Sequence, residues 1–445
     1  MSSASAAGRV AVVGAGVGGL VAAIRLAEAG MQVEVFDPAP RAGGLAGGIE
    51  TGGGSVERFY HHIFRSDIVV QRWIHALGLA PRLEFLRADM GFYSGGRMYA
   101  FGTPLSLLRF TALPFTDRLK LGLRISRLSR ISAPDQFEDH SARDWLKRRV
   151  SEAEMRVFWE PLLGAKFGID LDKVSMAWLW ARFRARAGGS VGRSERLGYL
   201  RGGFQQLGDA LTKRAASLGV QLHFGTRVSA VLTDSGRVRA LATTPIGDVA
   251  TDAVIWTPSL AALPSAVADL PPEYAARCAA IRYHHAISVL VELPRSALPY
   301  YWVTVADPTL PFTVAVEHTR LLPADDYGGR TLAYLGRYAP PEDPVASASP
   351  EEVRDLFIEA AARAFSPVFA NPIATYVSRA PAAQPVTPPG WAAARPPLRT
   401  GLPGLVTANM AQIYPWDRGM NYSMELGESA AEAALDEIRD LRSVS

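Results

Sequence analysis

The stretch Arg9-Val-Ala-Val-Val-Gly14-Ala-Gly16-Val-Gly-Gly19-Leu decides the fold of this chain of 445 residues. The apolar run before Gly14 predicts a buried strand, and the glycines predict a tight turn. The alanine-rich stretch from Leu20 predicts a helix that ends at Gly30. The next strand, Val33-Glu-Val-Phe-Asp37, ends in an acid. Strand, glycine-rich turn, helix and strand, closed by an acid, predict a dinucleotide site.

Each part of this motif has its own physical role. Gly14 allows the turn, Gly16 lets backbone N–H groups approach a pyrophosphate, and Gly19 lets the helix pack closely on the strand. The N-terminus of the helix then faces the negative charge of the ligand. We expect the carboxylate of Asp37 to accept hydrogen bonds from the ribose of an adenosine.

A second glycine motif, Arg41-Ala-Gly43-Gly44, follows the acid within one loop. There an arginine can pair with the pyrophosphate, while two glycines let the chain pass beside a flavin. With this R-x-G-G box the sequence resembles the superfamily of flavin amine oxidases, protoporphyrinogen oxidases and phytoene desaturases. The resemblance implies FAD, held by Arg41, Gly43 and Gly44 together with the first motif. It also implies the α/β class, with a Rossmann-like FAD-binding domain of the glutathione-reductase type interleaved with an α+β substrate domain.

The length of the chain fits two domains built from interleaved segments. Two insertions form the substrate domain. The first is mostly helical, and the second alternates apolar runs with turns, which predicts an antiparallel sheet. The predicted segments of the FAD-binding domain are 1–65, 196–265 and 396–445, and those of the substrate domain are 66–195 and 266–395.

The resemblance brings two middle segments back to the cofactor. A strand that begins with Arg227-Val228 is similar to the family's segment in which a valine backbone meets the adenine. The strand that ends at Thr257-Pro258 resembles the family's return strand over the dinucleotide.

The C-terminal segment also resembles a cofactor-binding element of the family. Asn409 stands where relatives carry an acid, and it can still hydrogen-bond a ribityl hydroxyl. The final helix begins near Gly419, Met420 and Asn421, and in the family such a helix points its N–H groups at the flavin. A helix N-terminus stabilises the negative charge that reduction places there. Relatives that bind their flavin covalently carry a cysteine in the loop before this helix. Cys278 lies outside that loop, so the resemblance implies non-covalent FAD.

Candidate catalytic residues lie one loop beyond the glycine turn at 52–54, in the segment that contains Tyr60 and His62. The box His62-Ile-Phe64 resembles that of UDP-galactopyranose mutase, a member of the same structural class. A helix that carries Arg182 resembles the mutase helix whose arginine binds the substrate diphosphate. Tyr60, His62 and Arg182 are therefore the predicted catalytic set, although a purely structural histidine is an equal alternative for His62.

The positions of the lysines bear on the type of oxidation. Many amine oxidases hold a water against flavin N5 with a lysine of the second insertion, whereas the lysines of this chain are Lys120, Lys147, Lys166, Lys173 and Lys213. This disfavours C–N oxidation of a simple amine. Dehydrogenation of a C–C bond, ring oxidation and redox-neutral flavin chemistry remain open.

These patterns predict an FAD-dependent oxidoreductase that moves a hydride from an organic small molecule to flavin N5. The alternative is a redox-neutral mutase or isomerase similar to UDP-galactopyranose mutase. Its diphosphate-sugar site would need a compact set of arginines and tyrosines, which Arg182, Arg282, Tyr283, Arg320 and Tyr338 suggest only loosely. A weaker alternative is a non-catalytic binding protein similar to prenyl-protein chaperones, which do not need an intact R-x-G-G box.

Composition bears on the ligands, the metal content and the location of the protein. The net charge of +4 is spread along the chain, and no arginine–aromatic pattern predicts nucleic-acid binding. The single cysteine excludes a disulfide framework, and the adjacent histidine pairs 61–62 and 284–285 do not predict a metal site. No stretch of about 18 apolar residues occurs, which predicts a cytoplasmic protein without an integral membrane segment. The basic amphipathic stretch at 116–131 leaves peripheral membrane contact open, and nothing predicts the oligomeric state.

Overall fold

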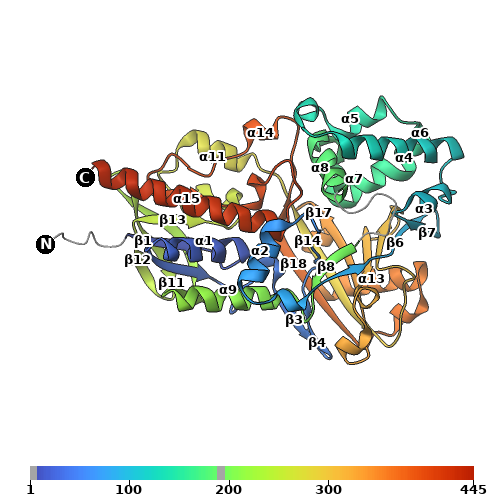
Figure 1. Cartoon of the computed structure of the whole chain (residues 1–445), viewed down its shortest axis with the longest axis horizontal. Helices are drawn as coiled ribbons and strands as arrows, with labels where there is room; N and C mark the ends of the chain where they lie inside the picture. The colour runs from blue at the N-terminus through green and yellow to red at the C-terminus, as the bar shows by residue number, and fades with distance from the viewer. Residues whose placement is uncertain (1–7, 188–195, 445) are drawn as a thin grey trace.

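The computed structural model describes residues 8–187 and 196–444. Its elements form three regions (Figure 1), with the parallel sheet and its helices at one end of the molecule, a helical layer at the upper right and a large sheet at the lower right. The first and last elements, β1 (Arg9–Val13) and α15 (Met420–Val444), both belong to the first region.

The sheet of the first region is parallel throughout, and the order of its strands is β19 (Leu405–Thr407), β13 (Ala253–Trp256), β1, β2 (Gln32–Asp37) and β9 (Gln221–Phe224). Successive residues of β1 point to opposite faces, so Val10 and Val12 join one core cluster while Ala11 and Val13 join another. Both faces are therefore buried, as a parallel sheet requires. The predicted α/β class with a Rossmann-like domain is confirmed.

Two helices flank α1 (Val17–Glu28) on one face of this sheet, namely α9 (Gln205–Ser217) and α15. The other face packs against a three-stranded antiparallel sheet, which consists of β10 (Arg227–Asp234), β11 (Arg237–Thr244) and β12 (Gly247–Ala250). Small helices near this side are α10 (Leu263–Ala266), α11 (Pro272–Ala279) and α14 (Trp391–Ala394).

The large sheet of the substrate region has seven strands. Their spatial order is β18 (Ala374–Pro385), β14 (Tyr283–Leu293), β17 (Thr331–Ala339), β16 (Val314–Glu317), β15 (Trp302–Val305), β6 (Met90–Ser94) and β7 (Arg97–Phe101). The antiparallel pairing of β14, β17, β16 and β15 confirms the sheet predicted for the second insertion. The α-helices between β17 and β18 are α12 (Pro344–Ser347) and α13 (Pro350–Ala364).

The first insertion departs from the mostly helical prediction, because it also contributes strands. β6 pairs with β15 in parallel, so both insertions build one sheet, while β5 (Leu83–Arg87) pairs with β8 (Arg196–Leu200). A short antiparallel pair, β3 (Gly48–Thr51) and β4 (Gly54–Glu57), precedes this insertion in the chain. The helices of this insertion are α2 (Ile68–Ala76), α3 (Pro104–Leu108), α4 (Phe115–Arg130), α5 (Ala142–Lys147), α6 (Glu152–Glu154), α7 (Glu160–Phe167) and α8 (Met176–Ala187). The domain boundaries themselves stay predictions.

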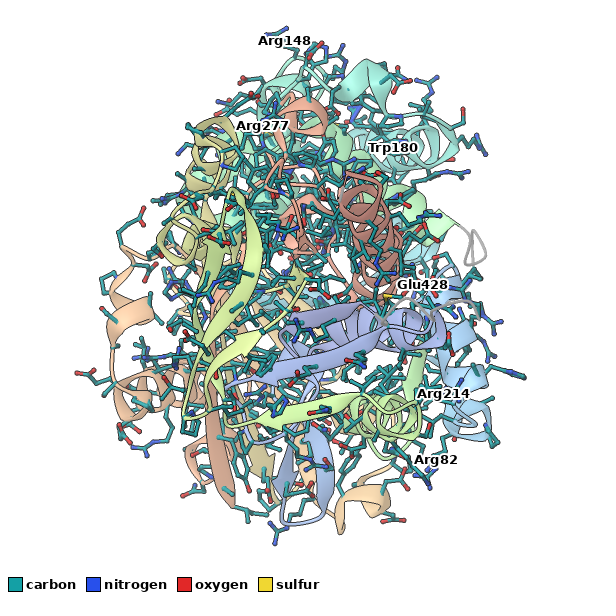
Figure 2. The ribbon with its side chains drawn as sticks, turned by 90° about the vertical axis from the view of Figure 1, so that its left-hand side faces the viewer. Arg82, Arg148, Trp180, Arg214, Arg277 and Glu428 are labelled. Atoms are coloured by element: carbon teal, nitrogen blue, oxygen red, sulfur yellow. The ribbon has the colours of Figure 1, made fainter. Side chains whose placement is uncertain are left out.

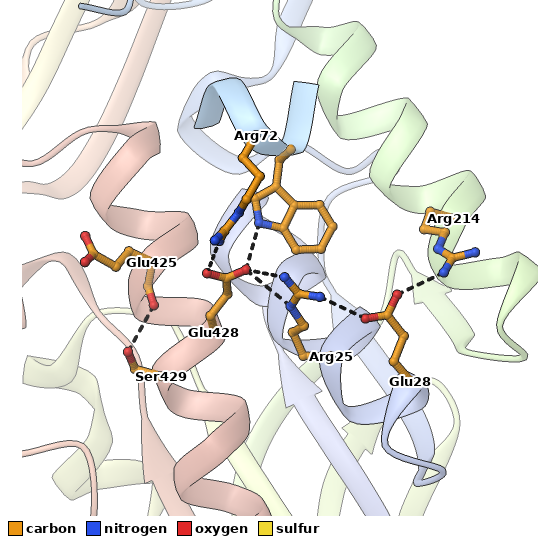
Figure 3. Close-up of polar contacts among 8 residues, drawn as sticks. Arg25, Glu28, Arg72, Arg214, Glu425, Glu428 and Ser429 are labelled. Carbon is orange, nitrogen blue, oxygen red and sulfur yellow. Dashed lines mark hydrogen bonds and ion pairs between the residues drawn. The ribbon is translucent and has the colours of Figure 1, made fainter. Parts of the chain in front are cut away.

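Helices α1 and α15 approach so closely that glycine is needed on both. A Cβ at Gly18 would lie 2.6 Å from the carbonyl oxygen of Ser423, and one at Gly427 would lie 2.2 Å from the carbonyl oxygen of Gly18. Glu428 of α15 then pairs with Arg25 of α1 and Arg72 of α2 (Figure 3). These contacts hold α15 against α1 and α2.

The side-chain view of Figure 2 shows Glu428 beside this group of helices, with Arg214 of α9 below it and Trp180 in the helical layer above. Arg25 also pairs with Glu28 at 3.0 Å, and Glu28 pairs with Arg214 at 2.9 Å. The charged groups therefore link α9, α1, α2 and α15 in a chain of ion pairs.

A buried carboxyl group ties β4 to the segment around β8 and to β17 of the large sheet. Glu57 at the end of β4 accepts hydrogen bonds from the backbone N–H of Phe204 and from the hydroxyl of Tyr199 at 2.8 Å. Tyr334 of β17 donates to the carbonyl oxygen of Glu57 at 2.7 Å. Burial raises the pKa of Glu57 to about 7, although the hydrogen bonds from Phe204 and Tyr199 lower it.

Because the folded-state pKa of Glu57 lies above its unfolded value, its contribution to stability is fully present below about pH 4.5 and is lost as the pH rises through about 7. We expect this loss to reach about 3 kcal/mol. Glu57→Gln should therefore raise the thermal midpoint relative to wild type more at pH 8 than at pH 5. The control is Glu359→Gln on the exposed face of α13, and equal shifts of the Glu57 variant at both pH values would refute the assignment.

Candidate active site

The two glycine motifs lie side by side at the carboxyl end of β1. Gly14 has a φ of 104°, and a Cβ there would lie 2.1 Å from the hydroxyl oxygen of Thr257. The backbone N–H of Gly43 donates to the carbonyl oxygen of Ala15 at 3.0 Å, and Gly16 and Gly43 form an isolated parallel bridge. The predicted close packing at Gly19 is confirmed, because a Cβ there would lie 2.0 Å from the carbonyl oxygen of Gly14.

The space beside these glycines fits the pyrophosphate of a dinucleotide. A Cβ at Gly16 would meet no described heavy atom closer than Gly44 Cα at 4.0 Å, so glycine is not needed there for contacts within the protein. Gly16 is the N-cap of α1, no side chain caps this helix, and its first turn holds no acid. The free N–H groups and the helix dipole favour a bound anion at this point.

The predicted polar residues of the first segment surround this turn. The carboxylate of Asp37 accepts hydrogen bonds from the backbone N–H groups of Ala15 at 2.7 Å and Ala39 at 2.8 Å. Its position at the end of β2, against the glycine turn, is the one expected for binding a ribose. Arg41 is half exposed and pairs with Asp209 at 3.0 Å, so it would have to turn from this partner to reach a pyrophosphate.

The middle segments return to the same place. Val228 is the second residue of β10, next to an irregularity in the register with β11. Thr257 follows β13 and donates to the carbonyl oxygen of Val13 at 2.7 Å. The amide nitrogen of Asn409 donates to the carbonyl oxygens of Thr257 and Pro258, and its oxygen accepts from Ala411 and Tyr283. A hydrogen bond from Asn409 to a ribityl hydroxyl would have to replace one of these four.

The final helix begins beside the catalytic segment. Gly419, Met420 and Asn421 stand at the start of α15, and the predicted helix start is confirmed. The side-chain oxygen of Asn421 accepts from the backbone N–H groups of Val69 at 2.9 Å and Val70 at 3.2 Å. Asn421 therefore holds the N-terminus of α2 against that of α15, a structural role that the resemblance did not imply.

A cavity of about 220 Å³ lies where these segments meet. Its walls come from the loop after β4, from α7 and α8, from β15 to β17 and from the loop that leads into α15. All three predicted catalytic residues, Tyr60, His62 and Arg182, line it together with residues 419–421. The structure thus brings the three candidates together, while their chemical roles stay predictions.

His62 lies half-buried among aromatic rings, with Phe64 at 5.3 Å and Trp302 at 5.8 Å between centroids. Burial and the positive charges of Arg186 and Arg182 lower the pKa of His62 to about 3, so its ring is neutral at physiological pH. Among the described residues, Nδ1 of His62 has no hydrogen-bond partner. Because unpaired buried polar atoms are rare in proteins, this nitrogen is available to a bound molecule.

Tyr60 packs edge-on against Trp302 with 5.0 Å between ring centroids. Burial, and after it the neighbouring Tyr338, raise the pKa of Tyr60 well above its usual value, so its phenol keeps its proton. Tyr338 in turn accepts a hydrogen bond from Arg418 at 2.6 Å. The phenols and the guanidinium form one polar wall of the cavity.

Sequence reasoning missed the charged group beside this wall. Lys166 of α7 forms an ion pair with Asp417, and Arg182 approaches the same carboxylate at 3.5 Å. The pair Asp417-Arg418 immediately precedes Gly419 at the predicted flavin-facing helix, which was the one available signal. Lys166 stands in the segment just before the helix that carries Arg182, but nothing in the sequence showed that its ammonium group meets Asp417.

Other predicted residues lie elsewhere. Arg282 pairs with Asp170 and Glu342, and Arg320 pairs with Glu317 at 3.4 Å, so neither belongs to the cavity wall. Of the loosely suggested diphosphate-sugar set, only Arg182 and Tyr338 line the cavity. No group of three or more His, Cys, Asp and Glu side chains suited to a metal ion occurs within residues 8–187 and 196–444.

Comparison with known proteins agrees with this architecture. A phytoene desaturase of Myxococcus xanthus that forms zeta-carotene is 26% identical over 302 residues, which are 62% of this chain and 56% of that protein. The mitochondrial protoporphyrinogen oxidase of Nicotiana tabacum is 28% identical over 180 residues, 39% of this chain and 35% of that protein. The chain thus spans only about a third to a half of the length of these curated relatives.

Similarity of structure extends over nearly the whole chain. A structure of reduced UDP-galactopyranose mutase matches with a TM-score of 0.75 at 16% identity, covering 96% of both chains, and at this identity it shows the fold alone. The model of the family described as flavin containing amine oxidoreductase matches residues 17–435, from the start of α1 into α15. The chain therefore belongs to the flavin containing amine oxidoreductase family, whose cofactor is the FAD that its glycine cradle fits.

Proposed function

We propose that this enzyme is an FAD-dependent oxidoreductase that takes a hydride from an organic small molecule bound in the cavity. The observation that carries the proposal is that one helix, α15, contacts both parts of the site. It packs against α1, which follows the glycine turn, and its first turn lines the cavity. Membership of the family supports the class of reaction.

Each part of the site would have its own role in binding the cofactor or the substrate. Backbone N–H groups in the first turn of α1, which follows Gly16, would hold the pyrophosphate, with Asp37 on the ribose. The N-terminus of α15 would stabilise negative charge that develops on reduction. When bound, FAD supplies the hydride acceptor. Neutral His62 and protonated Tyr60 would orient the substrate by hydrogen bonds, because neither carries charge at physiological pH.

The redox-neutral mutase is not favoured. The family and the curated relatives carry the names of oxidases, oxidoreductases and desaturases, and the likeness to the mutase is one of fold. The non-catalytic alternative is likewise not favoured by the family match. Lys166 of the first insertion lines the cavity, but its ammonium group is paired with Asp417. We therefore keep the proposal that the substrate undergoes C–C dehydrogenation or ring oxidation and not the oxidation of a simple amine.

Peripheral contact with a membrane surface is a second proposal, carried by the exposed face of α4. Phe115, Leu119 and Leu123 follow one another at helical spacing and are 59%, 50% and 52% exposed. Exposed basic residues, among them Lys120 and Arg127, surround them, which suits anionic headgroups. No helix in the part of the chain that the structure describes is long and apolar enough to cross a membrane. A cytoplasmic location stays a prediction.

The proposed reaction predicts that a substrate bleaches the visible absorption of the oxidised enzyme anaerobically, and that an electron acceptor restores it, because the electrons of the substrate reside on the flavin. Stopped-flow absorbance measures both phases. Turnover that occurs only after chemical reduction of the enzyme, with no acceptor consumed, would instead establish the mutase.

The α4 face predicts binding to vesicles that contain anionic lipid and none to neutral vesicles, since apolar insertion and charge attraction act together. Leu119→Glu with Leu123→Glu should abolish co-sedimentation, whereas Leu356→Glu, on an exposed apolar residue of α13, should not. Equal sedimentation of all three proteins would exclude this face as the contact.

A further inference from the structure

Three cationic side chains gather around one carboxylate in the cavity. Lys166 comes from α7, Arg182 from α8, and Arg418 from the loop before α15. Their common acidic neighbour is Asp417, which forms the ion pair with Lys166 and lies 3.5 Å from Arg182. Although burial raises the pKa of Asp417, these cations lower it below its usual value, so it is ionised.

Arg418 has neutral partners among the described residues. Its guanidinium donates to the side-chain oxygen of Gln384 at 2.9 Å and to the hydroxyl of Tyr338 at 2.6 Å. The remaining carboxyl group on the cavity wall is Asp67, which accepts from the backbone N–H of Phe64 at 2.8 Å. Burial raises the pKa of Asp67 to about 6. One acid therefore faces three cations in this cluster.

The cluster is shielded from water. The side chains of Lys166 and Arg182 are 12% and 20% exposed. Burial and the charges of Arg182 and Arg418 lower the pKa of Lys166 to about 7, although Asp417 raises it. A buried excess of positive charge is costly unless a counter-charge accompanies it. The start of α15, at residues 419–422 of the same wall, adds the positive end of a helix dipole.

Among the described residues, Asp417 is the acid paired with Lys166 and Arg182, which leaves room for a further counter-charge from a bound molecule. The pyrophosphate of FAD belongs to the other end of the site, at the N-terminus of α1, where the two glycine motifs meet. Guanidinium groups pair well with oxyanions, because their N–H groups match the two oxygens of such a group. Arg182 and Arg418 therefore suit a ligand with a carboxylate or a phosphate.

We propose that Lys166, Arg182 and Arg418 form a subsite for an anionic group of the substrate, a carboxylate or a phosphate, and that Asp417 sets its charge. The inference rests on the proposed function, since it takes the cavity as the substrate site. It also specifies that function, because a primary amine, whose ammonium group is positive, would meet the excess positive charge and bind poorly.

Calorimetric titration of the FAD-loaded enzyme at pH 6 tests the proposal with small probes. Benzoate should bind at least about tenfold more tightly than its uncharged analogue benzamide, as expected for a charged hydrogen bond, and benzylamine should bind more weakly than benzamide. Phenyl phosphate beside benzoate distinguishes the two kinds of anion. Equal affinity for benzoate, benzamide and benzylamine would overturn the proposal.

Variants locate the binding. Arg182→Met and Arg418→Met should each weaken benzoate binding about tenfold or more without changing affinity for benzamide. Lys213→Met on the exposed side of α9 is the control. Asp417→Asn should tighten benzoate binding, since it removes the acid from the cluster, and a misfolded protein could not mimic this gain. Unchanged benzoate affinity in Arg182→Met and Arg418→Met, or weaker binding in Asp417→Asn, would refute the subsite.

The two proposals fail in different ways. Reduction of the flavin by a neutral or cationic substrate, with no preference for benzoate, would leave the oxidoreductase standing and remove the anion subsite. Tight benzoate binding in an enzyme that no substrate reduces would do the reverse.

Discussion

Backbone contact through glycine is the constraint on which the rest of the structure depends. The turn after β1 fits only because Gly14 lacks a Cβ against Thr257, and α1 lies on β1 only because Gly19 lacks one against the Gly14 carbonyl. On its other side α1 meets α15 at Gly18 and Gly427. Three segments far apart in sequence are thus fixed around one helix, whose uncapped N-terminus points at the space for the cofactor.

The placement of α15 carries this constraint into the chemistry. Because the helix is held along α1, its first turn comes to the cavity, where Asn421 also binds the N-terminus of α2. Asp417 and Arg418 precede that turn, and Lys166 and Arg182 reach them from α7 and α8. The close glycine contact between α1 and α15 therefore helps to place the charged residues that precede α15.

The elements nearest the motifs could be predicted from the sequence, because strand, turn and helix are local and the glycines have few other uses. The strands β14 to β17 were equally visible from their alternation. By contrast, β6 is short and pairs on one side with the neighbouring β7 and on the other with β15, about 200 residues later, so no local pattern revealed this second partner. Lys166 and Glu57 were missed for the same reason, since each gains its meaning from partners brought in by the fold. Tyr60, His62 and Arg182 were found through resemblance, and the structure gathers them in one cavity.

The flavin content of purified wild type and Gly16→Ala tests the central claim most directly. The protein itself has room for a Cβ at Gly16, so the alanine would intrude on the bound pyrophosphate and on nothing else. We expect about one FAD per wild-type chain, released on denaturation because it is not covalently bound, and at least tenfold less in the variant. Gly164→Ala in α7, which also has room for a Cβ, is the control and should keep its flavin. Full FAD occupancy in Gly16→Ala would contradict the account.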